Sequence, residues 1–208
     1  MTAPLSSDPL HAAAQTALAR SIGAVTSFAE ALNAPTANSG RPTDQQRGGG
    51  ASLSEGLATA AKLIINHSET RIVVVSAGGF DTHANQLIAQ KGLLTDLAAG
   101  LQSFTVAIDQ AGMSDDVLVV TTSEFGRRVA ENGSGGTDHG TGNVSLMLGT
   151  KIVPGIHGEL DMTNLVNGDI RPGIDPRTIY TTCLAWLGAD PNAVLGKGYN
   201  QVTLLNPS

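Results

Sequence analysis

The sequence predicts an α/β fold, with a mostly parallel sheet flanked by helices and one antiparallel return strand. Two short apolar runs rich in β-branched residues, RIVVVSA at 71–77 and DVLVVTT at 116–122, are typical of strands covered on both faces. Residues 84–112 lie between them and carry the apolar spacing of a long amphipathic helix. A strand, a helix and a strand in this order form a βαβ unit, whose strands are nearly always parallel.

The N-terminal quarter of the chain differs in composition from the rest. Residues 9–33 are rich in Ala and Leu, with apolar positions three or four apart, which predicts a helix. Residues 33–50 are rich in Pro, Gly, Ser, Thr and Asn, which indicates a mobile linker. We therefore expect an N-terminal helix and linker over 1–50 and a main domain over 51–208.

Two more helices are expected from their end signals. Ser52 with Glu55 three residues later makes a capping-box pattern, which predicts a helix over about 52–67. Asp175 followed by Pro176 opens a last helix that continues to Leu187, because Pro is favoured at the first helical position.

The remaining segments are predicted to be short strands and loops. Residues 144–148 read as a strand, and too few residues separate it from 116–122 for a crossover helix, so we expect an antiparallel return. Residues 123–143 are Gly-rich and expected to be irregular, and residues 149–175 are expected to form loops and short extended pieces.

Composition narrows the function classes. The 208 residues hold 12 Lys and Arg against 18 Asp and Glu, a net charge of −6, which disfavours nucleic-acid binding. The single cysteine, Cys183, cannot form an internal disulfide. No apolar run approaches the roughly 20 residues of a membrane span, and MTAPLSSDPLHAAAQ lacks the pattern of a secretory signal. We expect a soluble chain without a targeting signal.

Acidic and imidazole groups follow the predicted strands. Asp81 and His83 come after the first strand, Glu124 after the second, and Asp138 and His139 just before the return strand. Open α/β sheets bind ligands outside the carboxyl ends of their strands, so these groups are expected to share one edge. Carboxylates and imidazoles together suit a divalent ion such as zinc, manganese, magnesium or calcium.

Each of these segments also has a purely structural interpretation. The segment that contains Asp81 could cap the long helix, and Asp138 could be a turn former. Glu124 could form a surface ion pair with Arg127 or Arg128; in the functional interpretation, these arginines instead hold a substrate anion through paired hydrogen bonds.

Four stretches resemble a known family: GGFDTHANQ, VVTTSEFGRR, ENGSGGTDHGTG and DPRTIYTTCLAWLG. Over about residues 52–200 the chain resembles the C-terminal half of the domain-of-unknown-function 1501 family, which is placed in the alkaline-phosphatase-like superfamily with the sulfatases. The resemblance implies an alkaline-phosphatase-like core, present in part, and a divalent-metal site of the kind that hydrolyses phosphate or sulfate esters.

By this resemblance, Asp81 and His83 correspond to ligands after one strand, and Glu124 stands where the superfamily has an Asp-His pair. His139 resembles a late histidine ligand, and Asp138 serves beside it or orients it. An alternative alignment puts Asp138 and His139 on the Asp-His pair itself.

The sequence departs from the superfamily in one respect. The nucleophilic Ser or Thr of catalytic members lies in an N-terminal half, and residues 1–50 contain no strand that could carry it. We therefore expect half a site, with a small anionic ester as substrate or a partner chain that supplies the missing half. Most full-length members carry an export signal that this sequence lacks. Two functions stay open: a metal-dependent hydrolase-like domain, and a non-catalytic binding or assembly module with a structural or vestigial metal.

Overall fold

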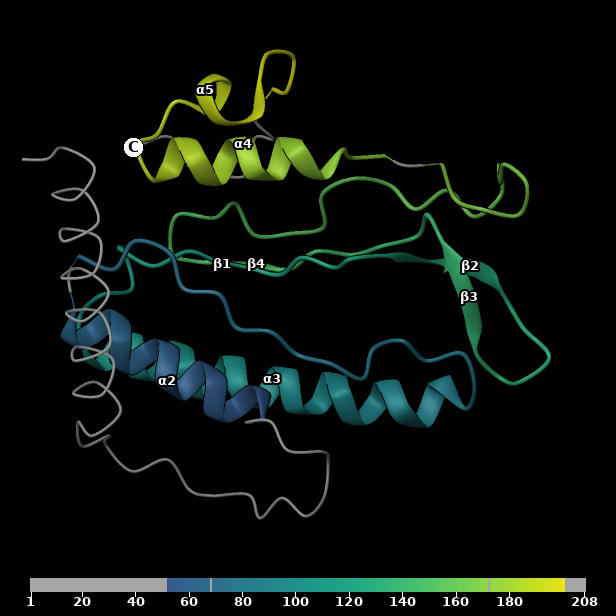
Figure 1. The fold of residues 1–208 in the computed structure, drawn as a ribbon, viewed down its shortest axis with the longest axis horizontal. Helices are drawn as coiled ribbons and strands as arrows, with labels where there is room; N and C mark the ends of the chain where they lie inside the picture. The colour runs from purple at the N-terminus through teal and green to yellow at the C-terminus, as the bar shows by residue number, and fades with distance from the viewer. Residues whose placement is uncertain (1–51, 68, 172, 201–208) are drawn as a thin grey trace, which may run out of the picture.

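The computed structural model describes residues 52–67, 69–171 and 173–200, which form a mixed α/β fold (Figure 1). Helices α2 and α3 make one layer, short strands and extended segments make a middle layer, and α4 and α5 lie on the opposite side. The hairpin β2–β3 stands at one end. The elements are α2 (Leu53–Asn66), α3 (Gln86–Gln110), β1 (Val119–Val120), β2 (Gly126–Glu131), β3 (Thr137–Gly140), β4 (Met147–Leu148), α4 (Pro176–Trp186) and α5 (Pro191–Leu195).

Helix α2 begins at the predicted capping box. The hydroxyl of Ser52 accepts a hydrogen bond from the Glu55 backbone N–H at 3.2 Å, and the Glu55 carboxylate accepts one from the Ser52 N–H at 2.9 Å. Two of the N–H groups that lack a partner inside the helix are thereby satisfied. The helix predicted over 52–67 is confirmed.

The main hydrophobic core lies where α2 packs on α3. Leu101, Phe104 and Ile108 of α3 are buried there together with Leu57 and two alanines of α2. The helices approach closely at Gly100, where an added Cβ would lie 2.9 Å from the Leu57 side chain. The long helix predicted over 84–112 is confirmed as α3.

The predicted apolar stripe of α3 is buried only along its C-terminal half. Leu87 and Leu94, which belong to the apolar spacing of this helix, are 85% and 51% exposed. Helix α2 has 14 residues against 25 in α3, so it cannot cover the whole length of its neighbour.

The strands pair antiparallel, as predicted for the return strand at 144–148. Val119 pairs with Leu148 and Val120 with Met147, so the β1–β4 pair confirms the predicted return over a shorter length. The mostly parallel sheet does not form among the described residues, whose two sheets are both two-stranded and antiparallel. These residues therefore show no alkaline-phosphatase-like core.

The segment 71–77 explains the difference. It runs extended without strand pairing in the described part of the chain. Val73 and Val75 nevertheless pack against the α2–α3 core, as do Val117 and Val119 of the second predicted strand. Apolar burial placed both runs on the same helical layer, but burial alone does not form the backbone ladder that makes two segments one sheet.

A hairpin replaces the irregular segment expected over 123–143. Strands β2 and β3 pair with Gly126 opposite Gly140, Arg127 opposite His139, and Glu131 opposite Thr137, with an irregularity between the last two pairs. The Asn-Gly-Ser-Gly-Gly sequence at 132–136 forms the turn, in which Gly135 has a φ of 69° that favours glycine.

Helix α4 begins and ends as predicted. The Asp175 carboxylate accepts from the Arg177 backbone N–H at 2.9 Å, Pro176 occupies the first turn, and Gly188 follows the helix with a φ of 76°. A hydrogen bond of 2.8 Å between Tyr180 Oη and Thr122 Oγ1 connects α4 to the end of the second extended run.

The short helix α5 was not predicted. The helix predicted over 9–33 and the linker over 33–50 lie outside the described residues. Within the described ranges, no helix is both long enough and apolar enough to cross a membrane.

Candidate metal centre

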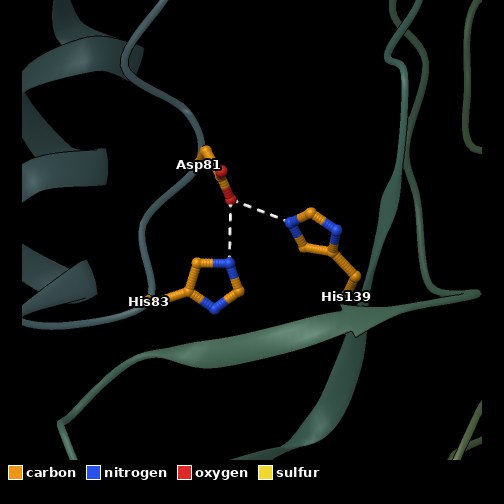
Figure 2. A group of neighbouring side chains, drawn as sticks. All are labelled: Asp81, His83 and His139. Atoms are coloured by element: carbon orange, nitrogen blue, oxygen red, sulfur yellow. Dashed lines mark hydrogen bonds and ion pairs between the residues drawn. The ribbon is translucent and has the colours of Figure 1, made fainter.

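Three predicted ligands converge at one end of the molecule. Oδ1 of Asp81 lies 3.0 Å from Nε2 of His83 and 2.8 Å from Nε2 of His139. Figure 2 shows both imidazole rings turned toward this carboxylate, His83 from the same loop and His139 from the hairpin. One potential ligand atom from each residue falls within 4.8 Å of the others. Two segments far apart in the sequence thus supply a carboxylate and two imidazoles to one point.

Local backbone geometry explains why Asp81 and His83 face the same way. The backbone turns at Asp81, where the Thr82 N–H donates to the Phe80 carbonyl at 2.9 Å, and it bends at His83. Thr82 between them points inward: it is 8% exposed, and its hydroxyl accepts from Gln90 of α3 at 3.3 Å. Burial of Thr82 therefore turns Asp81 and His83 outward.

The His139 ring is held by an aromatic neighbour. Phe125 stacks on it with centroids 4.0 Å apart and planes at 11°, and the His83 ring lies 4.9 Å away. Arg127 pairs with His139 across the β2–β3 ladder. Stacking and strand pairing together restrict the direction in which Nε2 of His139 points.

Arg127 joins the hairpin to the Asp81 loop. Its guanidinium donates to the carbonyl of Thr137 at 2.6 Å and to that of Phe80 at 2.7 Å, and it lies 3.5 Å from Oδ1 of Asp81. The side chain is only 16% exposed. These contacts show Arg127 supporting the site from within, so its role as an anion clamp stays a prediction.

Arg128 points to another part of the fold. It donates to the Asn167 carbonyl and lies 3.9 Å from the Asp169 carboxylate. The predicted anion contact of Arg128 is likewise untested.

Asp138 and Glu124 lie outside the three-residue group. Asp138 Oδ1 is 3.6 Å from Nδ1 of His83, on the nitrogen that does not face Asp81. This is the position from which a carboxylate orients a metal-binding histidine. Glu124 follows β1 in an exposed bend and is not brought into the group. Its role as a ligand stays a prediction.

The start of α3 shows that Asp81 does not act as a helix cap. The N-cap residue is Asn85, with a φ of 48° and no side-chain capping bond. The hairpin turn caps the helix instead, since Asn85 N–H donates to Ser134 O at 3.2 Å and Gln86 N–H donates to Gly135 O at 2.8 Å. The capping interpretation of the Asp81 segment is wrong.

The charges around Asp81 favour its ionised form. Its pKa is lowered, first by the hydrogen bond with His139 and then by the nearby charges of His83, His139 and Arg127. An ionised carboxylate beside two imidazoles is the protonation state that binds a cation.

The Asp81 carboxylate and the two histidines would have to move apart slightly to bind an ion. Tetrahedral ligands with bonds of about 2.1 Å lie about 3.4 Å apart. The two short contacts of 2.8 and 3.0 Å would therefore open by about half an ångström as an ion replaces the shared protons. The rings and the carboxylate are between 48% and 59% exposed, so this movement meets little packing resistance.

Phe125 and Asn132 are not among the site residues predicted from the sequence. Phe125 stands directly after Glu124, and nothing in the local pattern indicates that it stacks on a histidine. Asn132 opens a five-residue Gly-rich segment, a signal for a hairpin with a longer loop. Its contacts with His83 and Asp138 depend on how the hairpin docks.

Comparison with known proteins gives one assignment. No curated protein and no solved structure matched the chain. The family model described as "Protein of unknown function (DUF1501)" matches residues 8–203, and so extends N-terminal to the resemblance noted over 52–200. This match over most of the sequence shows that the chain belongs to the DUF1501 family.

Proposed function

We propose that this chain is a metal-dependent hydrolase-like domain of the alkaline-phosphatase and sulfatase type, acting on a phosphate or sulfate ester. One observation supports the proposal most directly: Asp81 Oδ1 lies 3.0 and 2.8 Å from the Nε2 atoms of His83 and His139. Its assignment to the alkaline-phosphatase-like superfamily belongs to the same proposal.

The composition of the group favours particular ions. Two imidazoles and one carboxylate are a common protein ligand set for zinc in catalytic sites, whereas magnesium and calcium prefer oxygen ligands. Of the ions expected from the sequence, zinc fits best, and manganese follows. Three protein ligands leave coordination positions for water and substrate.

A divalent ion bound there would polarise an ester oxygen and lower the pKa of a bound water. The chain's own residues support that chemistry by position. Asp81 supplies the negative charge, while Phe125 and Arg127 hold His139 and the Asp81 loop in place. The site is open to solvent, so a small ester can reach it.

Hydroxyl groups near the site have other partners. Thr82 accepts from Gln90, and Thr137 donates to Gln86. We therefore favour attack by water over a covalent intermediate on a residue of this part of the chain.

A second candidate function is a non-catalytic binding or assembly module with a structural ion. Exposed apolar side chains favour it: Ile72 and Val74 on the unpaired extended segment are 68% and 82% exposed, and Leu87 and Ile88 of α3 are 85% and 80% exposed. Surface of this kind is typical of partner contacts. A partner chain that supplies further strands or a nucleophile would fit both candidates.

Metal content and turnover separate the two. The purified full chain is titrated with Zn²⁺ and Mn²⁺ by calorimetry, then assayed with p-nitrophenyl phosphate and p-nitrophenyl sulfate, with and without a chelator. Hydrolysis that the chelator abolishes supports the hydrolase. Stoichiometric binding without turnover supports the binding module, and failure to bind either ion at neutral pH contradicts both.

A further inference from the structure

We propose that Asn132 is a positioning residue for the metal centre: it holds Asp138 beside His83, so that Nε2 of His83 faces the ion. This inference rests on the proposed function, but it concerns a residue that neither binds the ion nor touches Asp81. Its basis is a set of four hydrogen bonds made by one half-buried side chain.

The two ends of the Asn132 amide have different tasks. Oδ1 accepts from the backbone N–H groups of Ser134 at 2.9 Å and Gly136 at 3.1 Å, which folds the hairpin turn. Nδ2 donates to the carbonyl of His83 at 3.0 Å and to Oδ1 of Asp138 at 3.2 Å. The oxygen end shapes the turn, and the nitrogen end connects this turn to the ligand loop.

The nitrogen end controls both the backbone and the ring of His83. Its bond to the His83 carbonyl fixes the loop, and its bond to Asp138 keeps that carboxylate 3.6 Å from Nδ1 of His83. A carboxylate on that side of the ring helps to keep the opposite nitrogen, Nε2, turned toward Asp81 and the ion. Asn132 therefore acts on the centre through Asp138 and the His83 backbone.

The chemistry of asparagine allows its two tasks to be separated. Asn132→Asp keeps an oxygen that can accept from Ser134 and Gly136, so the turn retains its bonds. It replaces the Nδ2 donor by a second carboxylate oxygen, which is repelled by the His83 carbonyl and by Asp138. Asn132→Ala removes both tasks.

The matched control is Asn66→Asp at the end of α2. Asn66 Nδ2 donates to the Lys62 carbonyl at 2.9 Å, so this variant also exchanges a side-chain donor for a charge. The substitution is outside the site and reports the general cost of that exchange for stability.

The experiment uses the full chain. Zn²⁺ affinity is measured by calorimetry, and Co²⁺ is added separately so that its visible spectrum reports the ligand geometry. We expect Asn132→Asp to weaken Zn²⁺ binding by about 10- to 100-fold, the range for residues that support a ligand, and to alter the Co²⁺ spectrum. Its melting temperature should fall no further than that of Asn66→Asp.

A second variant keeps the test decisive if Asn132→Asp folds poorly. Asp138→Asn leaves Asn132 in place and should weaken Zn²⁺ binding by a similar factor. Wild-type affinity and spectrum in either variant would overturn the inference and leave the proposed function standing. Absence of Zn²⁺ binding by the wild-type chain would overturn both.

Discussion

Two glycines of the β2–β3 turn test whether this turn packs on the loop that carries Asp81 and His83. Gly136 is buried, and a Cβ added to it would lie 2.7 Å from Ala84 N and closer still to the His83 carbonyl. These are backbone atoms, which cannot rotate away as a side chain can. Gly133 lies in the same turn, and a Cβ added there meets nothing within 4 Å. Gly136→Ala and Gly133→Ala are therefore a matched pair.

Two opposing effects set the change in the free energy of unfolding that Gly136→Ala causes. Overpacking of this kind costs about 1–3 kcal/mol, while replacing Gly by Ala restricts the unfolded chain and stabilises by about 0.4–1 kcal/mol where the conformation is compatible. Because the contact is with backbone, we expect Gly136→Ala to lose about 2 kcal/mol net, or about 4–8 °C in melting temperature for a chain of this size. Gly133→Ala should be neutral or slightly stabilised.

The assay has two readouts. Thermal unfolding of the metal-free chain, followed by circular dichroism, measures the stability difference. Zn²⁺ titration measures the site, and it should weaken only in Gly136→Ala, because the turn pushes against His83. If the two variants melt at the same temperature and bind Zn²⁺ equally, the turn does not pack on the loop that carries Asp81 and His83, and the docked hairpin does not position the site.

Two further predictions concern the ligands and the pH dependence. His139→Ala should weaken Zn²⁺ binding by more than about 10-fold because it removes a direct ligand. Glu124 lies outside the three-residue group, so Glu124→Gln should weaken binding less than His139→Ala does; equal losses in calorimetry would show that Glu124 contributes to ion binding as much as His139. The ion pair and hydrogen bonds with Arg177 lower the pKa of Asp175 from 3.8 to about 2, so its contribution to stability is present above its unfolded pKa and is lost as pH falls through the folded value. Asp175→Asn keeps a side-chain cap but removes the charge, so its melting temperature should lie below that of the wild type above about pH 4, with the difference vanishing toward pH 2; a constant difference across that range would contradict this reasoning.

Local signals predicted the helices well. The Ser52–Glu55 capping box and the Asp175–Pro176 start each place a helix end where the structure has it. Such signals succeed because the bonds that they describe join residues two or three positions apart. The short return strand was predicted for a similar reason, since the chain between the strands is too short for a parallel crossover.

Longer-range pairing was predicted less well. The run at 71–77 has the composition of a buried strand, and two of its valines are packed on the core, yet it has no strand partner in the described ranges. Composition reports that a segment favours burial in a sheet; it does not report which backbone lies beside it. The hairpin was missed because its strands, GRRVAE and TDHG, have little apolar alternation, although the Gly-rich turn signal was present.

At the candidate site, too, local features were predicted from the sequence and long-range contacts were not. The sequence alone named the residues that meet in the structure, an Asp-x-His segment and a distant histidine, but it named them among five candidate ligands. Only the tertiary structure decided that Glu124 lies outside the group, that the hairpin turn caps α3 in place of Asp81, and that Asn132 connects the turn to His83. The physical reason is that ligand chemistry belongs to single side chains, whereas their convergence depends on how a hairpin packs against a loop nearly 50 residues earlier in the chain.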